Sequence, residues 1–273
     1  MLFCVAACYT MDMIFLPIII FGLGLIIGSF LNVIIFRLNT GRGVVRGRSK
    51  CDRCDRTLVW YELIPVLSFL HLRGKCRTCD AQLSFQHPIV ELITGLIFVL
   101  LYTKIVLTQG ITPVSVVSFI GSATLASLLI IMMMYDLKHK IIPDKIVYPF
   151  IAIAGLSVIW KSFTVAGFLF LPAVLSGLVL AAPFFFLWFF SKGRAMGFGD
   201  VKLALGIGAI VGMIGSVSVF LLSFWIGAIV GLLLMASSRA GMKSEIPFAP
   251  FLIIATFIVS VCGVTIQSLF PLW

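Results

Sequence analysis

Long apolar runs recur along the whole chain, and they restrict its fold more than any other feature. Hydrophobic residues make up 61% of the 273 residues, and the mean hydropathy is +1.20. Runs of about 20 apolar residues are long enough to cross a bilayer as helices. Only helices and closed barrels satisfy backbone polar groups in lipid, and continuous rather than alternating runs favour helices. The sequence therefore predicts an all-α polytopic membrane protein.

We expect about eight transmembrane helices, with seven as the alternative. The apolar runs cover roughly residues 13–36, 88–108, 114–135, 146–161, 164–190, 201–215, 216–237 and 247–270. Only Gly215 and Ser216 separate the sixth run from the seventh, so the count depends on that break. The predicted organisation has three parts. These are a first membrane segment (1–36), a polar insert (37–87) and the remaining membrane domain (88–273).

The formal net charge of +10 is explained by membrane topology better than by nucleic-acid binding. If the helices alternate, eighteen of the 20 Lys and Arg residues fall on one side, in residues 37–87, 136–145, 191–202 and 238–246. Basic loops mark the cytoplasmic side of a membrane protein. We therefore expect a cytoplasmic insert, both termini outside, membrane lipid as a partner, and no nucleic acid.

The insert carries two Cys-x-x-Cys pairs, Cys51 with Cys54 and Cys76 with Cys79. Four thiolates can close a tetrahedral zinc shell, and a closed shell is structural because it has no open position. The alternative is a pair of disulfides, which are rare in the reducing cytosol. The sequence thus predicts a structural Zn²⁺ site, with Gly74 allowing one of the turns.

Two aspartates lie where apolar runs meet short basic loops. Asp136 follows the third run, and Asp200 follows Gly197 and Gly199 at the start of the sixth. Ionisable groups at such positions mark functional sites. Two converging carboxylates can act as acid and base on water. Asp144 is the runner-up for Asp136, because an Asp directly after a proline is also suited to capping a helix.

Capping is the ordinary alternative for Asp200 as well, since it opens the sixth run. The glycines before it remove side chains where another backbone must approach. We expect Gly197, Gly199 and Lys202 to border a substrate groove. The loop before the last run contains Pro247, Phe248 and Pro250, and it either borders the same groove or is a simple turn.

Taken together, these features resemble the type IV prepilin peptidases, and the resemblance covers nearly the whole chain. The matching segments are residues 28–33 with Arg37 and Leu38, the two Cys-x-x-Cys pairs, residues 88–92, Asp136 with residues 142–144, residues 197–202 and residues 247–251.

The resemblance implies an aspartic endopeptidase with the Gly-x-Gly-Asp motif in the bacterial inner membrane. Its substrates would be prepilins or pseudopilins of a type IV pilus or type II secretion assembly. It would cleave them after a Gly at the cytoplasmic face, with Asp136 and Asp200 as the catalytic pair. The same enzyme would methylate the new N-terminal residue, usually Phe, from S-adenosylmethionine.

Methyl transfer rests on the resemblance alone. Glu91, at the membrane end of the second run, is one candidate residue, and Gly74 with Lys75 beside the second cysteine pair is another. Gly24 and Gly28 are expected to let helices pack closely. Two alternatives stay open, a peptidase without methyltransferase activity and a transporter with a zinc-stabilised cytoplasmic domain.

Overall fold

The computed structural model is built from helices joined by short connections. It describes residues 2–40, 43, 47–51, 53–165, 167, 169–194, 196–237, 246–265 and 267. The long helices are α1 (Leu2–Arg37), α3 (Gln86–Tyr102) with the π-helical turn η2 (Thr103–Leu107), α4 (Pro113–His139), α5 (Asp144–Thr164), α6 (Phe170–Ser191), α7 (Phe198–Ala236) and α8 (Ala249–Cys262). In the described residues no strand forms, and the all-α fold class is confirmed.

Six of the described helices are long and apolar enough to cross a membrane, so the chain is a multi-pass membrane protein. The predicted fifth run began at residue 164, but α5 continues to that residue and α6 begins at Phe170. The last run was predicted to reach residue 270, whereas α8 ends at Cys262 because Gly263 adopts φ 68°. Apolar side chains continue through both boundaries, so hydropathy alone could not place either turn.

The break in α7 lies at Gly212, three residues before the predicted position. Gly212 has φ 77° and ψ −178°, which only glycine adopts readily. Residues eight apart in an unbroken helix are separated by about 12 Å along the axis. Here, however, the Ser216 hydroxyl lies 3.4 Å from the Gly208 carbonyl oxygen. The chain therefore folds back at Gly212, and the two halves of α7 correspond to the predicted sixth and seventh runs.

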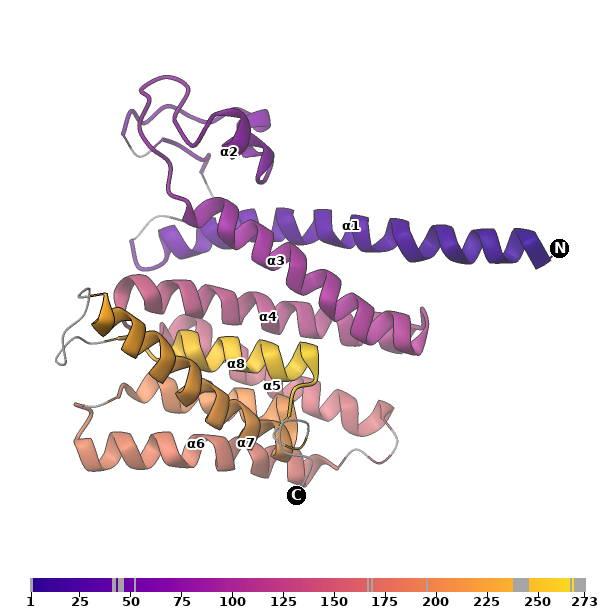
Figure 1. Cartoon of the computed structure of the whole chain (residues 1–273), viewed down its shortest axis with the longest axis vertical. Helices are drawn as coiled ribbons and strands as arrows, with labels where there is room; N and C mark the ends of the chain where they lie inside the picture. The colour runs from indigo at the N-terminus through magenta and orange to yellow at the C-terminus, as the bar shows by residue number, and fades with distance from the viewer. Residues whose placement is uncertain are drawn as a thin grey trace. The chain divides into compact units, whose positions relative to one another are not determined.

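The chain divides into two compact units, residues 1–131 and 132–273. In the first unit α1 packs against α3, and the insert lies at the end of this pair where α1 ends and α3 begins (Figure 1). The insert contains the 3₁₀ turn η1 (Trp60–Leu63) and the short helix α2 (Leu67–His71). The predicted domain boundary at residue 88 thus falls inside this unit.

Glycines set the distance between α1 and α3, as expected. A Cβ at Gly24 would lie 2.6 Å from the Gly95 Cα, and one at Gly28 would lie 2.7 Å from the Glu91 Cα. Without a side chain the two backbones approach closely, which is the usual way helices associate in lipid. This contact places Glu91 directly against α1.

The second unit is organised around α7, which packs against α5, α6 and α8. Its contact with α6 also depends on glycine, since a Cβ at Gly208 would lie 2.5 Å from the Ser176 carbonyl oxygen. The Ser176 hydroxyl donates to the Gly208 carbonyl at 2.8 Å, which satisfies this polar group inside the unit. The two candidate catalytic aspartates both belong to the second unit.

Replacing Gly28 by Ala should separate α1 from α3, because the new methyl group meets backbone atoms that cannot rotate away. We expect Gly28→Ala to lower the stability in detergent by about 1–3 kcal/mol, typical of overpacking. Gly22 is the matched control on the same helix, since nothing lies within 4 Å of a Cβ there. Thermal unfolding of both variants measures the difference, and equal destabilisation would contradict this packing.

Candidate functional site

The four cysteines of the insert come together as predicted. The Sγ atoms of Cys51, Cys54, Cys76 and Cys79 all lie within 4.8 Å of one another. Those of Cys51 and Cys79 are 3.8 Å apart. Zinc bonds to sulfur are about 2.3 Å, so neighbouring sulfurs of a tetrahedral shell are about 3.8 Å apart. A disulfide requires about 2.05 Å. The cluster can therefore hold a metal ion, and no disulfide joins any of these four cysteines.

Two matching turns present these cysteines. The Cys51 N–H donates to the Arg56 carbonyl at 3.0 Å, and the Asp55 N–H donates to the Cys51 carbonyl at 3.0 Å. The same pair of bonds recurs at Cys76 and Asp80. Both aspartates adopt positive φ, 53° and 51°. The internal repeat Cys-x-x-Cys-Asp is the sequence signal for these matching turns.

The electrostatics around Cys76 favour a metal-binding thiolate. Backbone N–H groups of Thr78 and Cys79 lower the pKa of the Cys76 thiol to about 6. The Arg56 guanidinium hydrogen-bonds both Cys76 and Glu62, and its distance to the Glu62 carboxylate is 2.8 Å. This hydrogen bond lowers the pKa of Glu62. Partners behind the ligands orient them and tune the metal.

Histidines do not join the cysteine cluster in the described structure. His87 instead stacks on Phe36, with ring centroids 4.9 Å apart, in the contact between α1 and α3. His71 is exposed at the end of α2. The four cysteines therefore form a complete ligand set by themselves.

Replacing one ligand should remove the metal, because three thiolates leave a structural shell open. We expect purified wild-type protein to contain one metal ion per chain and Cys54→Ser to contain less than about a tenth of that. Cys262→Ser is the control, since Cys262 is exposed at the end of α8 and outside the cluster. Elemental analysis measures the stoichiometry, and full metal content in Cys54→Ser would disprove the ligand set.

Asp136 and Asp200 lie close enough to interact electrostatically. Asp136 is in the last turns of α4 and is only 5% exposed. Asp200 is half-buried in the first turn of α7. Two carboxylates in such an arrangement do not both ionise readily at neutral pH, which suits them to share a proton and act on one water molecule.

The start of α8 contacts Asp136 directly. The backbone N–H of Ala249 hydrogen-bonds its carboxyl group, so the N-terminus of α8 points at the pair of aspartates. Phe248, immediately before α8, packs on Phe184 and Phe224, with ring centroids 5.5 and 5.1 Å away. The loop was predicted as either a groove border or a turn. In the structure this loop leads into α8, and the N–H of Ala249 at the start of α8 donates to Asp136.

Asp200 is not the N-cap of α7, because Gly197 occupies that position. Asp200 is three residues further on, and its carboxyl group accepts a hydrogen bond from the backbone N–H of Gly197. That bond is half of a capping box. Asp200 therefore helps to cap α7 from three residues inside the helix, and it also interacts with Asp136.

Asp144 does not cap α5 either, since Pro143 is the N-cap and Asp144 follows it. Its carboxylate forms an ion pair with Lys202 at 2.7 Å. The Lys202 ammonium also lies over the Tyr148 ring, 4.7 Å from its centroid. The structure thus engages Asp144 with Lys202 and places Asp136 near Asp200.

The two glycines of the motif have different surroundings. A Cβ at Gly199 would lie 2.9 Å from the Ile142 Cβ, so the start of α7 packs directly on the loop between α4 and α5. A Cβ at Gly197 would meet only ordinary contacts, the nearest at 3.8 Å from Asp200. Gly199 therefore serves the fold, and the exposed Gly197 leaves space beside the aspartates.

This difference can be tested without substrate. Gly199→Ala should lower the stability by about 1–3 kcal/mol, because its methyl group pushes against a β-branched side chain. Gly197→Ala should leave thermal unfolding unchanged, since its backbone has φ −75° and the space is free. A stable Gly199→Ala variant would show that this contact does not hold α7 in place.

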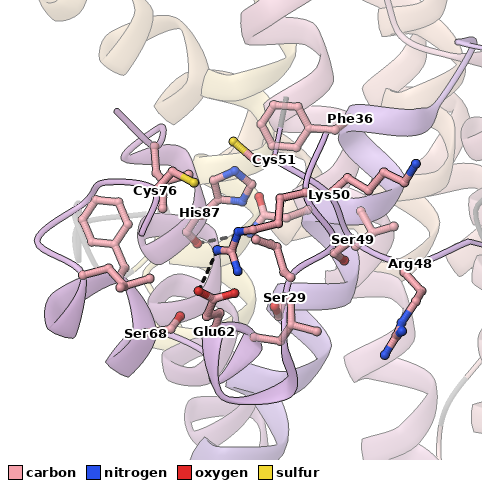
Figure 2. Close-up of a pocket in the computed structure, with 18 of the residues that line it drawn as sticks. Ser29, Phe36, Arg48, Ser49, Lys50, Cys51, Glu62, Ser68, Cys76 and His87 are labelled. Atoms are coloured by element: carbon pink, nitrogen blue, oxygen red, sulfur yellow. Dashed lines mark hydrogen bonds and ion pairs between the residues drawn. The ribbon is translucent and has the colours of Figure 1, made fainter. Parts of the chain in front are cut away.

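A cavity of about 640 Å³ lies in the first unit, between the insert and the adjoining ends of α1 and α3 (Figure 2). Glu91, one of the predicted methyl-transfer residues, lines it and is 6% exposed. Gly74 and Lys75 are not among its lining residues. Gly74 turns the chain at φ 68° and packs against Phe69, as expected of its turn role.

Sequence reasoning assigned no role to Ser29 and Asn32 of α1, which also line the cavity. Both residues occur in the segment that resembles the family's first helix. Their polar side chains inside an otherwise apolar run were the available signal, because polar groups are rare in membrane helices without a role.

Two family models match the chain. Residues 22–105 match the bacterial peptidase A24 N-terminal domain. Residues 123–232 match the type IV leader peptidase family. The first match covers the insert with its flanking helices, and the second contains both Asp136 and Asp200.

Curated relatives match over most of the chain, and each is named prepilin leader peptidase/N-methyltransferase. The protein from Myxococcus xanthus is 36% identical over 233 residues, which are 84% of this chain and 66% of that relative. The protein from Bacillus subtilis is 32% identical over 261 residues, covering 92% and 96%. The protein from Aeromonas salmonicida strain A449 is 30% identical over 275 residues, covering 90% of each.

The chain therefore belongs to the type IV leader peptidase family. No solved structure matches it significantly.

Proposed function

We propose that this protein cleaves the leader peptides of prepilins and then methylates the new N-terminal residue. The observation that carries the first activity is the proximity of Asp136 and Asp200, on two helices of the same compact unit. The relatives are named for both activities. Family membership does not favour the transporter alternative.

Peptide cleavage can use one proton that the Asp136 and Asp200 carboxyl groups share. One carboxylate accepts a proton from water, which attacks the carbonyl carbon of the scissile bond, while the protonated carboxyl donates to the carbonyl oxygen. The tetrahedral intermediate then collapses, the C–N bond breaks, and the amine leaves with a proton from the pair. We assign the acid and the base to the pair as a unit, because coupled groups titrate together.

The space beside Gly197 is suited to the extended peptide. Lys202 and the half-buried Pro247 and Phe248 are the other groove candidates on this side of the unit, whereas Pro250 is buried in the first turn of α8. An extended chain in this region needs hydrogen-bond partners for its backbone. Pro247 and Pro250 have no N–H, so a nearby carbonyl that each would otherwise engage stays available as an acceptor for the peptide.

The charge distribution supports a cytoplasmic location for the insert and the aspartates, with both termini outside. A substrate leader that carries Lys or Arg stays on the same side by the same rule. The scissile bond then lies at the membrane edge, near the ends of the helices that carry the two aspartates. Prepilins or pseudopilins of a pilus or a type II secretion system satisfy this description.

The metal that fits the insert is Zn²⁺ in a structural role, since four thiolates leave no open position. The methyl donor that fits the second activity is S-adenosylmethionine. The neutral amine of the cleaved pilin attacks the methyl carbon, and the electrons of the C–S bond remain on sulfur. Sulfur becomes a neutral thioether, and the product nitrogen carries the positive charge as a methylammonium.

The peptidase is tested by replacing each carboxylate with its amide. Asp136→Asn and Asp200→Asn should each lower the rate of leader cleavage at least about a thousandfold, as expected for groups that act as a unit. Asp144→Asn should lower it by less than about tenfold, because an exposed ion pair is worth at most about 1 kcal/mol. Cleavage of a purified prepilin in detergent measures all three rates.

Normal cleavage by either Asp136→Asn or Asp200→Asn would exclude the pair. Mass spectrometry of the same reaction, with methyl donor present, reads the second activity. A methylated N-terminus supports the bifunctional enzyme, and a cleaved but unmethylated product would select a peptidase alone.

A further inference from the structure

The cavity in the first unit is not used by the cleavage chemistry, because both aspartates belong to the second unit. Its volume of about 640 Å³ falls within the range of small-molecule sites. We propose that this cavity binds the methyl donor, a nucleoside that carries a sulfonium centre, with Glu91 and Asn32 among its contacts. This inference rests on the methyl-transfer half of the proposed function.

Glu91 supplies a buried carboxyl group. Its carboxylate accepts a hydrogen bond from the Val66 N–H at 2.7 Å and another from Ser29. In the described part of the chain no Lys or Arg forms an ion pair with it. A buried charge is costly unless it is paired, so the group is suited to a ligand with a positive centre. A sulfonium is such a centre.

Two residues that line the cavity each carry a buried polar atom without a partner among the described residues. These atoms are the Asn32 Oδ1, on a side chain that is 2% exposed, and the Arg56 Nε. Asn32 is otherwise held in place, because its Nδ2 donates to the His87 carbonyl at 3.1 Å. Buried polar groups without partners are rare in proteins and indicate a missing ligand or water. A nucleoside with an amino-acid tail offers both donors and acceptors.

The remaining walls suit the other parts of such a molecule. Phe36 and His87 form a stacked aromatic pair that lines the cavity, which suits a planar base. Arg48 and Lys50 are exposed residues of the insert that also line the cavity, and their positive charge would attract a carboxylate. One cavity thus combines acidic, basic and aromatic groups, as a zwitterionic nucleoside requires.

The basic leader of a prepilin fits these walls less well. Its Lys and Arg residues would meet Glu91 but also Arg48, Lys50 and Arg77, and like charges at close range are unfavourable. A compact ligand with both signs of charge satisfies the walls better. The leader is therefore the rival occupant in the experiment.

The test is equilibrium dialysis of labelled S-adenosylmethionine against the full-length, metal-loaded protein in detergent. Glu91→Gln and Asn32→Leu should each raise the Kd at least about tenfold, as expected for the loss of a polar contact to a charged ligand. Asp144→Asn is the matched carboxylate control in the other unit, and its Kd should equal that of the wild type. Unchanged metal content in each variant shows that the insert is folded, because Cys51 and Cys76 also line the cavity.

A photoactivatable azido-adenosine analogue of the donor gives a second readout that does not depend on variants. Cross-linking within residues 29–36 or 47–91 supports the site. Labelling of the second unit would overturn the proposed site, and so would wild-type Kd values in both folded cavity variants. Either result would leave the proposed methyltransferase intact if the wild-type protein still methylates cleaved pilin. Displacement of the donor by a synthetic Lys-rich leader peptide would assign the cavity to the leader. A wild-type protein that neither binds the donor nor methylates cleaved pilin would overturn the proposed methyltransferase itself.

Discussion

Close backbone contact at small residues is the constraint on which this structure depends. Lipid is as apolar as the helix surfaces, so helices gain little by burying apolar side chains against each other, and close approach becomes decisive. Gly28 brings α1 onto α3 at Glu91, and Gly199 brings α7 onto the α4–α5 loop at Ile142. The first contact positions Glu91, and the second positions Asp200, which directly follows Gly199. The glycines thus organise the chemistry as well as the fold.

A second common feature is the way in which buried carboxylates are tied to the backbone. Asp136 accepts from the Ala249 N–H, Glu91 from the Val66 N–H, and Glu62 from the Val59 N–H at 3.0 Å. Hydrogen bonds to charged groups are stronger than neutral ones, and they are needed most where water is scarce. The bonds of Asp136 and Glu91 join distant segments, and that of Glu62 closes its own turn, so the acids also hold loops and helix ends in place.

The residues proposed for the two activities belong to different compact units. The aspartate pair lies within residues 132–273, while the cysteine cluster and the cavity lie within residues 1–131. The boundaries of the two family models follow a similar division. This separation gives a physical reason why cleavage and methylation could be lost independently, since the residues proposed for one activity do not line the site of the other.

The sequence alone determined the class of fold, singled out the four cysteines that come together, and predicted Asp136 and Asp200 as a catalytic pair. These depend on local properties, namely the length of apolar runs, the spacing of thiols, and charges at the ends of helices. The same reasoning placed the α7 break near Gly215, because hydropathy is continuous there and the positive φ of Gly212 is not visible in composition. It could not choose between Asp136 and Asp144 by geometry.

Only the tertiary structure decided that Lys202 engages Asp144 and that the start of α8 reaches Asp136. It alone also revealed the cavity that joins Asn32, Arg56 and Glu91. These are contacts between residues far apart in the sequence. They depend on how closely particular helices approach, which the pattern of a single chain does not encode.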